Sequence, residues 1–263
     1  LVDKGATSKK ITIGQEAISA LPIRDVSELY SLQSGVVKVE GGTKGGIPDH
    51  EERGLEEVHV RGGRSAEIAY LIDWMYIRNP IFGGIGNGTR LNLFAIQQFD
   101  WQPGGFNAEY GDAMSAVSNL HTNRGGAEFS YKFKYSSSLL GAKLYEQDEE
   151  FLRKLGSHYD QLRGYDDYNL GFGGTVPLLR KFKYWVSGQY TTYDNYRVYH
   201  FDSTAYIQDD PGNIENKKNL LQPWDAVKGF RGFGFDKTWD VFGKLDYKFS
   251  SKLRFNLSYW VVA

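Results

Sequence analysis

The second half of the chain alternates between apolar and polar residues with a period of two. This is the pattern of β-strands whose two faces meet different surroundings. Phe129, Tyr131, Phe133 and Tyr135, for example, interleave with lysines and serines. Five stretches follow the pattern: residues 129–136, 168–176, 182–191, 239–249 and 253–261. We therefore predict five antiparallel strands, each with one apolar face and one polar face.

The connections between these strands alternate in length. Residues 139–164 and 197–237 form long connections, whereas residues 177–181 and 250–251 form short ones. This alternation is typical of an outer-membrane β-barrel, with long external loops and tight periplasmic turns. The apolar faces would then meet lipid and the polar faces a wet lumen. A soluble antiparallel sandwich also alternates and stays an alternative, although its strands seldom reach ten residues.

Five strands are too few to close a membrane barrel. Bacterial barrels begin at about eight strands, and an open edge in lipid would leave backbone N–H and C=O groups without partners. We therefore expect this segment to be the front part of a longer barrel.

The composition changes near Gly125-Gly126. Residues 1–126 contain 10 aromatic residues and residues 127–263 contain 30. The first region is rich in glycine and predicts a mixed α and β structure, with short helices at 15–20 and after Asp25. It also predicts short strands at 57–61 and 68–73 and a helical turn at 94–98. We therefore predict two domains, residues 1–126 and residues 127–263.

Charge and composition exclude several classes of function. The formal net charge of −1 argues against a nucleic-acid binder. The absence of cysteine excludes disulfides, cysteine-ligated metals and thiol catalysis. No apolar run approaches the roughly 20 residues of a membrane-spanning helix. The five histidines lack metal-ligand spacing, and no catalytic grouping is apparent, so we expect no metal, no cofactor and no enzymatic activity.

Two loops have compositions that could suggest ligand sites. The glycines at 83–88 lack the lysine and the hydroxyl residue of a phosphate-binding loop, so a flexible loop is the better interpretation. The acidic residues at 209–215 lack the EF-hand pattern, which favours a solvated loop over a calcium site.

Several segments of the first region occur in the order of a known domain. VHVRGGRS at 58–65 is followed by AYLID at 69–73, and IRDVSELYSLQSG at 23–35 precedes both. Further matches cover residues 91–99, 104–111 and 119–126. Together these segments resemble the plug domain of TonB-dependent outer-membrane receptors. The resemblance is to the large receptors common in Bacteroidetes-like bacteria.

This resemblance implies a mainly β protein: a small α+β plug domain followed by the first strands of a barrel of about 22 strands, the size that holds a plug. It implies an outer-membrane receptor that binds an extracellular ligand of unknown identity and imports it with energy from TonB. Outer-membrane lipid would surround the barrel, and a surface lipoprotein could cover the long loops. A non-transporting binding or scaffold protein of the same architecture stays an alternative, as does a free-standing soluble plug-like protein.

The resemblance also carries candidate site residues onto this chain. Ligand-facing plug positions of the family correspond to these residues: Arg61, Arg64, Arg78, Asn79, Phe106, Asn107 and Tyr110. For Arg61, a structural role as a donor to neighbouring carbonyls is equally supported. Arg124 is a candidate for an ion pair between plug and barrel, and we expect its carboxylate partner to lie beyond these 263 residues.

One departure from the family concerns a tight turn. The family has glycine after the position of Asp73, where a hairpin needs a positive φ. This chain has Trp74 there, so the geometry of the turn is an open question at the level of sequence.

Overall fold

The computed structural model describes residues 10–23, 26–39, 55–64, 67–77, 85–86, 91–111, 113–138, 163–195, 197–200, 225–227, 230–250 and 252–263. The chain divides into two compact units. The first contains residues 1–132, 170–188 and 240–263, and the second contains residues 133–169 and 189–239. We call residues 10–126 the plug region. No helix among the described residues is long and apolar enough to cross a membrane.

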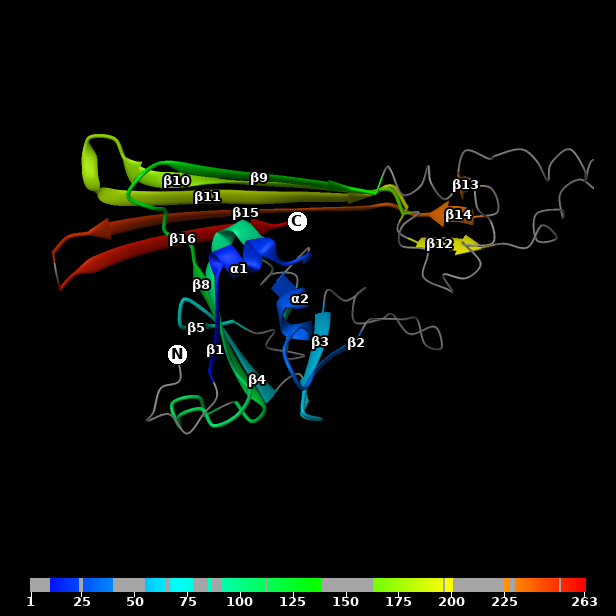
Figure 1. Cartoon of the computed structure of the whole chain (residues 1–263), viewed down its shortest axis with the longest axis horizontal. Coiled ribbons are helices and arrows are strands. Elements are labelled where there is room, and N and C mark those ends of the chain that lie inside the picture. Colours follow the sequence, from blue (N-terminus) through cyan, green and yellow to red (C-terminus); the bar gives the residue numbers. More distant parts are fainter. Residues whose placement is uncertain are drawn as a thin grey trace, which may run out of the picture. The chain divides into compact units, whose positions relative to one another are not determined.

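The described residues of the plug region form two small sheets and two short α-helices (Figure 1). One sheet has the order β1-β7-β8-β4-β5, and we call it the plug sheet. Its strands are β1 (Ile11–Gly14), β4 (Ile68–Ile72), β5 (Met75–Tyr76), β7 (Ile96–Gln102) and β8 (Ala116–Thr122). β4 and β8 are parallel, while β7 is antiparallel to both β1 and β8. The second sheet pairs β2 (Val36–Val39), β3 (Leu55–Val60) and β6 (Ile85–Gly86).

The helices are short because the sequence ends them quickly. α1 (Gln15–Ala20) stops at the residue before Pro22, and α2 (Val26–Ser31) is followed by Gly35 with φ of +78°. Both were predicted. Leu32 has the spacing of the apolar residues of the second helix, but it lies beyond the last helical residue and is exposed.

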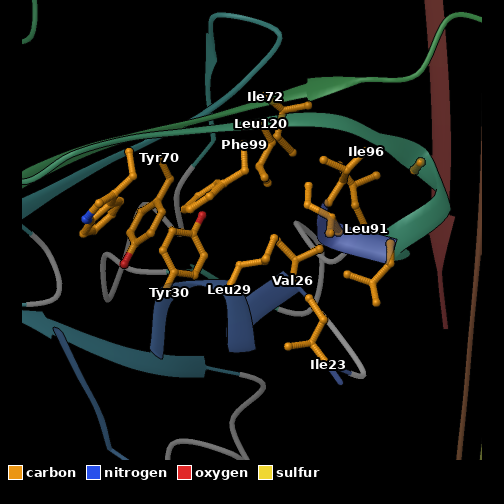
Figure 2. Packing of buried hydrophobic residues seen from close by; sticks show 14 of the residues in the cluster. Ile23, Val26, Leu29, Tyr30, Tyr70, Ile72, Leu91, Ile96, Phe99 and Leu120 are labelled. Carbon is orange, nitrogen blue, oxygen red and sulfur yellow. The ribbon is translucent and has the colours of Figure 1, made fainter. Parts of the chain in front are cut away.

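One face of the plug sheet packs on α2 to form the core. Figure 2 shows Leu29 and Tyr30 of α2 against side chains of β4, β7 and β8. The Tyr30 ring meets the rings of Tyr70 and Phe99 edge-on, with centroids 5.7 Å and 5.3 Å away. Its hydroxyl lies 2.8 Å from the Ser118 Oγ. The Tyr30 side chain is thus buried with its polar atom satisfied.

Strand and turn boundaries in the plug region differ slightly from the predicted ones. β3 begins at Leu55 and ends at Val60, because Arg61 adopts a φ of +51° in the following turn. β4 ends at Ile72, and the helical turn η3 (Leu93–Ala95) passes directly into β7. β1, β2 and β7 were not predicted, since each is short or lacks a clear alternation.

The second half of the chain forms one antiparallel sheet in the order β16-β15-β11-β10-β9, which we call the large sheet (Figure 1). Its strands are β9 (Ser130–Ser137), β10 (Tyr165–Val176), β11 (Leu179–Tyr193), β15 (Asp236–Lys248) and β16 (Arg254–Val262). All five were predicted. The long connection between β11 and β15 also contains a small sheet that was not predicted, in the order β12-β14-β13. Its strands are β12 (Arg197–His200), β13 (Asp225–Val227) and β14 (Phe230–Phe233).

The two faces of the large sheet differ as the alternation predicted. Tyr131, Leu257 and Tyr259 are exposed aromatic and aliphatic side chains of one face. The other face is buried and largely polar, and its members include Asp167, Asn169, Gln189, Thr191, Lys244 and Asp246. In the second unit, the Asp167 carboxylate accepts hydrogen bonds from three of these side chains, those of Asn169, Gln189 and Thr191. The polar face is therefore an organised hydrogen-bonding surface.

Candidate functional site

The face of the plug sheet that does not pack on α2 is polar and contains a pocket of about 200 Å³. The residue before β1, strands β7 and β8, the turn between β4 and β5, and the loop residues 107–110 all contribute to it. The lining residues are Lys10, Trp74, Asp100, Gln102, Asn107, Glu109, Tyr110, Val117 and Asn119. The pocket therefore combines two aromatic side chains with amides and carboxylates.

Asp100 is the centre of the hydrogen bonding beside this pocket. Its carboxylate accepts from Lys10 Nζ at 2.8 Å and Thr12 Oγ1 at 2.8 Å. Gln98 Nε2 donates to it at 2.9 Å, and His121 Nε2 also lies 2.9 Å away. Burial of the carboxyl group works to raise its pKa, but these partners outweigh it and hold the pKa of Asp100 far below its usual range. Asp100 thus stays ionised and ties β1 to β7 and β8.

Tyr110 and Asn107 are the predicted site residues that lie in the pocket. Tyr110 packs on a small apolar cluster formed by Ala69, Leu71, Ala113 and Val117, and Phe106 packs on the same cluster. Partial burial, followed by the neighbouring Glu109 carboxylate, raises the pKa of the Tyr110 phenol. The phenol therefore stays neutral and able to donate a hydrogen bond.

Two of the predicted arginines, Arg61 and Arg64, lie in the turn after β3 and are not among the residues that line the pocket. The Arg61 N–H donates to the Gly35 carbonyl at 2.9 Å, and the Arg61 side chain lies beside Gly35 and Gly104. The Arg64 N–H donates to the Glu67 carboxylate, which also accepts from Ser115 Oγ at 2.9 Å. Those two hydrogen bonds, with the Ser115 contribution larger, lower the pKa of Glu67. Arg78 and Asn79 lie outside the described residues.

A second set of residues connects the plug region with the large sheet inside the first unit. Lys244 of β15 donates to Asp73 Oδ2 at 2.6 Å and to Thr122 Oγ1 at 2.7 Å. The Lys244 side chain is almost fully buried. Asp73 also accepts from the Thr122 N–H at 2.9 Å. Burial works to raise the pKa of Asp73, but the bonds from Lys244 and Thr122 outweigh it and lower the pKa. We call these three residues the Lys244 latch.

Further contacts lie next to the helical turn η3. Trp185 Nε1 of β11 donates to the Phe94 carbonyl at 2.9 Å, and Asn92 Nδ2 donates to the Asp240 carboxylate. The Trp185 ring lies over Gly171, where an added Cβ would stand 3.0 Å from the indole and 3.2 Å from the Phe94 Cβ. A glycine at 171 is therefore what allows β10, Trp185 and Phe94 to approach so closely.

Arg124, the predicted partner of an ion pair between plug and barrel, is half-buried and has no ion pair with any residue that the structure describes. Sequence reasoning missed Asp73 and Lys244 as partners. The available signal was weak: the alternation at 239–249 puts Lys244 on the polar face of its strand, and Asp73 precedes an unusual turn residue.

The turn between β4 and β5 has two consecutive left-handed residues, with φ of +48° at Asp73 and +71° at Trp74. This is the sign pattern of a type I′ hairpin turn, which favours glycine at its second position. The turn is held by the Asp73 N–H on the Leu120 carbonyl at 2.9 Å and by the Trp74 N–H on Asn119 Oδ1 at 3.3 Å. The indole is 59% exposed and lines the pocket. The hairpin thus forms without glycine, and it places an aromatic ring at the pocket.

Comparison of the sequence with known proteins finds a relative among outer-membrane transport proteins. Over 94% of its length, the chain is 24% identical to the TonB-dependent transporter Oar of Myxococcus xanthus. The chain is a homologue of a TonB-dependent transporter. It spans 22% of the length of that transporter. No protein-family model matches the chain.

Solved structures of receptors share the fold. One is the ferric enterobactin receptor of Pseudomonas aeruginosa, solved as a mutant, with a TM-score of 0.56 and 17% sequence identity. The match covers 98% of this chain and 33% of the receptor chain. Another is the ferripyoverdine receptor of the outer membrane of the same species, with a TM-score of 0.60 and 9% sequence identity. The match covers 99% of this chain and 26% of the receptor chain. A third is the ferric yersiniabactin uptake receptor of Yersinia pestis, with a TM-score of 0.51 and 12% sequence identity. The match covers 91% of this chain and 29% of the receptor chain. The predicted mainly β fold is confirmed, and it is similar to the fold of these receptors. The relatives are transporters and receptors, not enzymes.

Proposed function

We propose that this chain is part of an outer-membrane receptor that binds an extracellular ligand and imports it into the periplasm with energy from TonB. Residues 1–126 would be its plug and residues 127–263 the first part of its barrel. The homology to a TonB-dependent transporter carries the proposal. The large sheet supports it, because its apolar face is exposed and its buried polar face binds the plug region through Lys244 and Trp185.

The same sheet supports an outer-membrane location. Exposed side chains such as Tyr131, Phe255 and Leu257 suit the acyl chains and interfaces of an outer membrane, where lipid would be the barrel's main partner. Long connections on one side would face outward and could bind a surface lipoprotein. Membrane fractionation of the native bacterium tests the location: the whole protein should accompany the outer membrane and resist extraction by salt or carbonate.

Ligand contact is proposed for the plug residues named from the family resemblance. Asn107 and Tyr110 are the pair best supported, because both line one pocket with Trp74. Arg61, Arg64, Phe106, Arg78 and Asn79 remain predicted contacts, and Arg124 a predicted plug-to-barrel contact.

Uptake by whole cells tests the function. Cells with and without the gene, and with and without TonB, receive radiolabelled ferric enterobactin and ferripyoverdine, the molecules named for two structural neighbours. Accumulation that needs both the gene and TonB is the expected result. Surface binding that is equal without TonB, with no accumulation, would instead support the non-transporting alternative. If neither probe binds, failure of the purified whole protein to bind the periplasmic domain of TonB would contradict the proposal.

A further inference from the structure

The two short connections of the large sheet lie at the same end of it (Figure 1). One joins β10 to β11, the other joins β15 to β16, and β11 and β15 are neighbours in the sheet. The Phe182 ring of β11 stacks on the Tyr247 ring of β15, with the centroids 4.1 Å apart. We call residues 177–183 and 247–254 the short-turn end. Both segments belong to the first unit, so they form one surface.

The short-turn end has a surplus of positive charge. Its two segments contain six basic residues and no acidic residue. The two long connections, residues 139–164 and 197–237, contain 10 basic and 11 acidic residues. One exposed carboxylate, Glu128, precedes β9 at the same end of the sheet, and the surplus exceeds it. The positive charge is therefore specific to this end of the sheet, because the formal net charge of the whole chain is −1.

Several of these cations lie next to one another on neighbouring strands. Lys248 and Arg254 are directly opposite each other in the pairing of β15 with β16. Lys181 precedes Phe182 and Lys248 follows Tyr247, so these two lysines are the next residues toward the turns on β11 and β15. Like charges on facing positions of neighbouring strands destabilise a sheet. The row of cations therefore has a cost within the protein alone.

Little of this charge is neutralised within the protein. Arg254 pairs with Asp246, with Nε 3.5 Å from Oδ1. Lys181, Lys248 and Lys252 are exposed, and none of them has an ion pair within the part of the chain that the structure describes. An anionic group bound at the short-turn end would pair with these three lysines and offset their mutual repulsion.

Apolar side chains lie at the same end. Leu178 is 100% exposed at the tip of its turn, with a φ of +72° that glycine would adopt more readily. Phe249 is 62% exposed and Leu253 is 59% exposed. Their turn is ordered, since the Phe249 N–H donates to the Leu253 carbonyl at 3.0 Å and the Leu253 N–H donates to Ser250 Oγ at 3.1 Å. The short-turn end thus presents apolar groups beside unpaired lysines.

A partner that matches both properties is an amphiphile with a negative headgroup. We propose that the short-turn end binds anionic phospholipid. The ammonium groups of its three unpaired lysines bind the lipid phosphates, and their alkyl stems lie along apolar surface. The exposed leucines and phenylalanine of its turns enter the boundary between headgroups and acyl chains. They continue the exposed apolar face of β16, which includes Phe255 and Leu257. This inference rests on the proposed function only for the location in a membrane.

Lipid binding to the whole protein tests this surface. The protein in detergent is titrated with phosphatidylglycerol, which is anionic, or with phosphatidylcholine, which has no net charge, and native mass spectrometry counts the bound lipids. The wild type should bind phosphatidylglycerol more tightly. The triple variant Lys181→Gln, Lys248→Gln, Lys252→Gln should weaken its tightest phosphatidylglycerol site by about fivefold per lysine, or on the order of 100-fold in all. Binding of phosphatidylcholine should not change.

The matched control removes three lysines from the long connection between β11 and β15. Lys217→Gln, Lys218→Gln, Lys228→Gln causes the same loss of charge and should keep the wild-type affinity. Leu178→Ser removes apolar contact without removing charge, so it should weaken the binding of both lipids alike. Unchanged binding of both lipids in Leu178→Ser would refute the apolar part of the contact.

Equal affinity of the wild type for the two lipids would overturn the inference, as would an unchanged phosphatidylglycerol affinity in the triple variant. If that variant fails to fold, the wild type alone decides: its preference must fall as the ammonium acetate concentration rises, and a preference independent of salt would refute the lysine contacts. Displacement of the lipid by an equal concentration of inorganic phosphate would show a simple anion site instead. The measurement needs neither ligand nor TonB, so failed uptake would contradict the proposed function and leave this result standing.

Discussion

The Lys244 ammonium and the Asp73 carboxylate lie 2.6 Å apart although 171 positions separate them in the chain. Lys244 belongs to a long strand of the large sheet, and Asp73 belongs to a tight turn of the plug sheet. The pair therefore joins two parts of the first unit that have different secondary structure and different composition.

Neutralising one partner should weaken this junction. In Asp73→Asn, the buried ammonium loses its anionic partner, which should lower the stability of the plug region by about 2 kcal/mol, since one member of the pair is only partly buried. Protease protection of the plug in the purified whole protein measures this. Glu128→Gln, at an exposed carboxylate, is the control. Equal protection in Asp73→Asn and the control would show that the ion pair contributes nothing.

The turn at Trp74 should gain stability from glycine. The left-handed backbone at Trp74 lowers the stability of the fold by about 1 kcal/mol. Glycine would not have this cost, so Trp74→Gly should resist denaturant better than Trp74→Ala. The alanine variant loses the same indole but keeps a Cβ at a φ of +71°. Urea unfolding of the whole protein in detergent, followed by protease sensitivity of the plug, gives the comparison. A glycine variant no more stable than the alanine variant would argue against strain.

Protonation of Asp100 in acid should weaken the attachment of β1 to the plug sheet. The pKa of Asp100 is depressed in the folded protein, so its contribution is complete above the unfolded pKa, near 4, and is lost as the pH falls through the folded value. The wild-type plug should therefore lose stability below about pH 4 more steeply than Asp100→Asn, which has no carboxyl group to protonate. Tryptophan fluorescence across an acid titration can follow this, since Trp101 is its buried neighbour in the sequence. Parallel acid profiles would contradict the assignment.

Gly171 should not tolerate alanine. The added Cβ would press on the Trp185 indole and on Phe94, which should displace the indole from the Phe94 carbonyl and cost about 1–3 kcal/mol. The measurement is thermal unfolding of the whole protein in detergent. Gly243→Ala, where the nearest atom to the new Cβ is 4.0 Å away, is the matched change on another strand of the same sheet. Similar melting temperatures for both variants would refute the steric argument.

The exposed face of the large sheet should reject charge if lipid covers it. Leu257→Lys places an ammonium on that face, and near the middle of a bilayer this costs about 2–4 kcal/mol. Its neighbour Ser258 lies on the opposite face of β16, so Ser258→Lys is the control. The yield of folded protein in the outer membrane should fall for Leu257→Lys and hold for Ser258→Lys. Equal yields would contradict a lipid-facing surface.

Much of the fold was predictable because it depends on local periodicity. A strand has a side-chain period of two, so Tyr131 and Lys132 had to face opposite sides wherever β9 was placed. The glycine of the family turn marked Trp74 as unusual before the structure showed its left-handed backbone. In the same way, the loop at 104–111 suggested Asn107 and Tyr110, which share one pocket.

The contacts between the plug region and the large sheet could not be predicted from local periodicity. Whether Asp73 meets Lys244 or Arg124 meets a carboxylate depends on how strands pair across more than a hundred residues, and no local pattern carries that information. The same holds for Asp100, whose four partners come from three strands and the residue before one of them. The sequence by itself determined which residues face which side of each strand. Only the tertiary structure decided which polar groups meet, because a buried charge is stable only where the folded chain brings its partners within hydrogen-bonding distance.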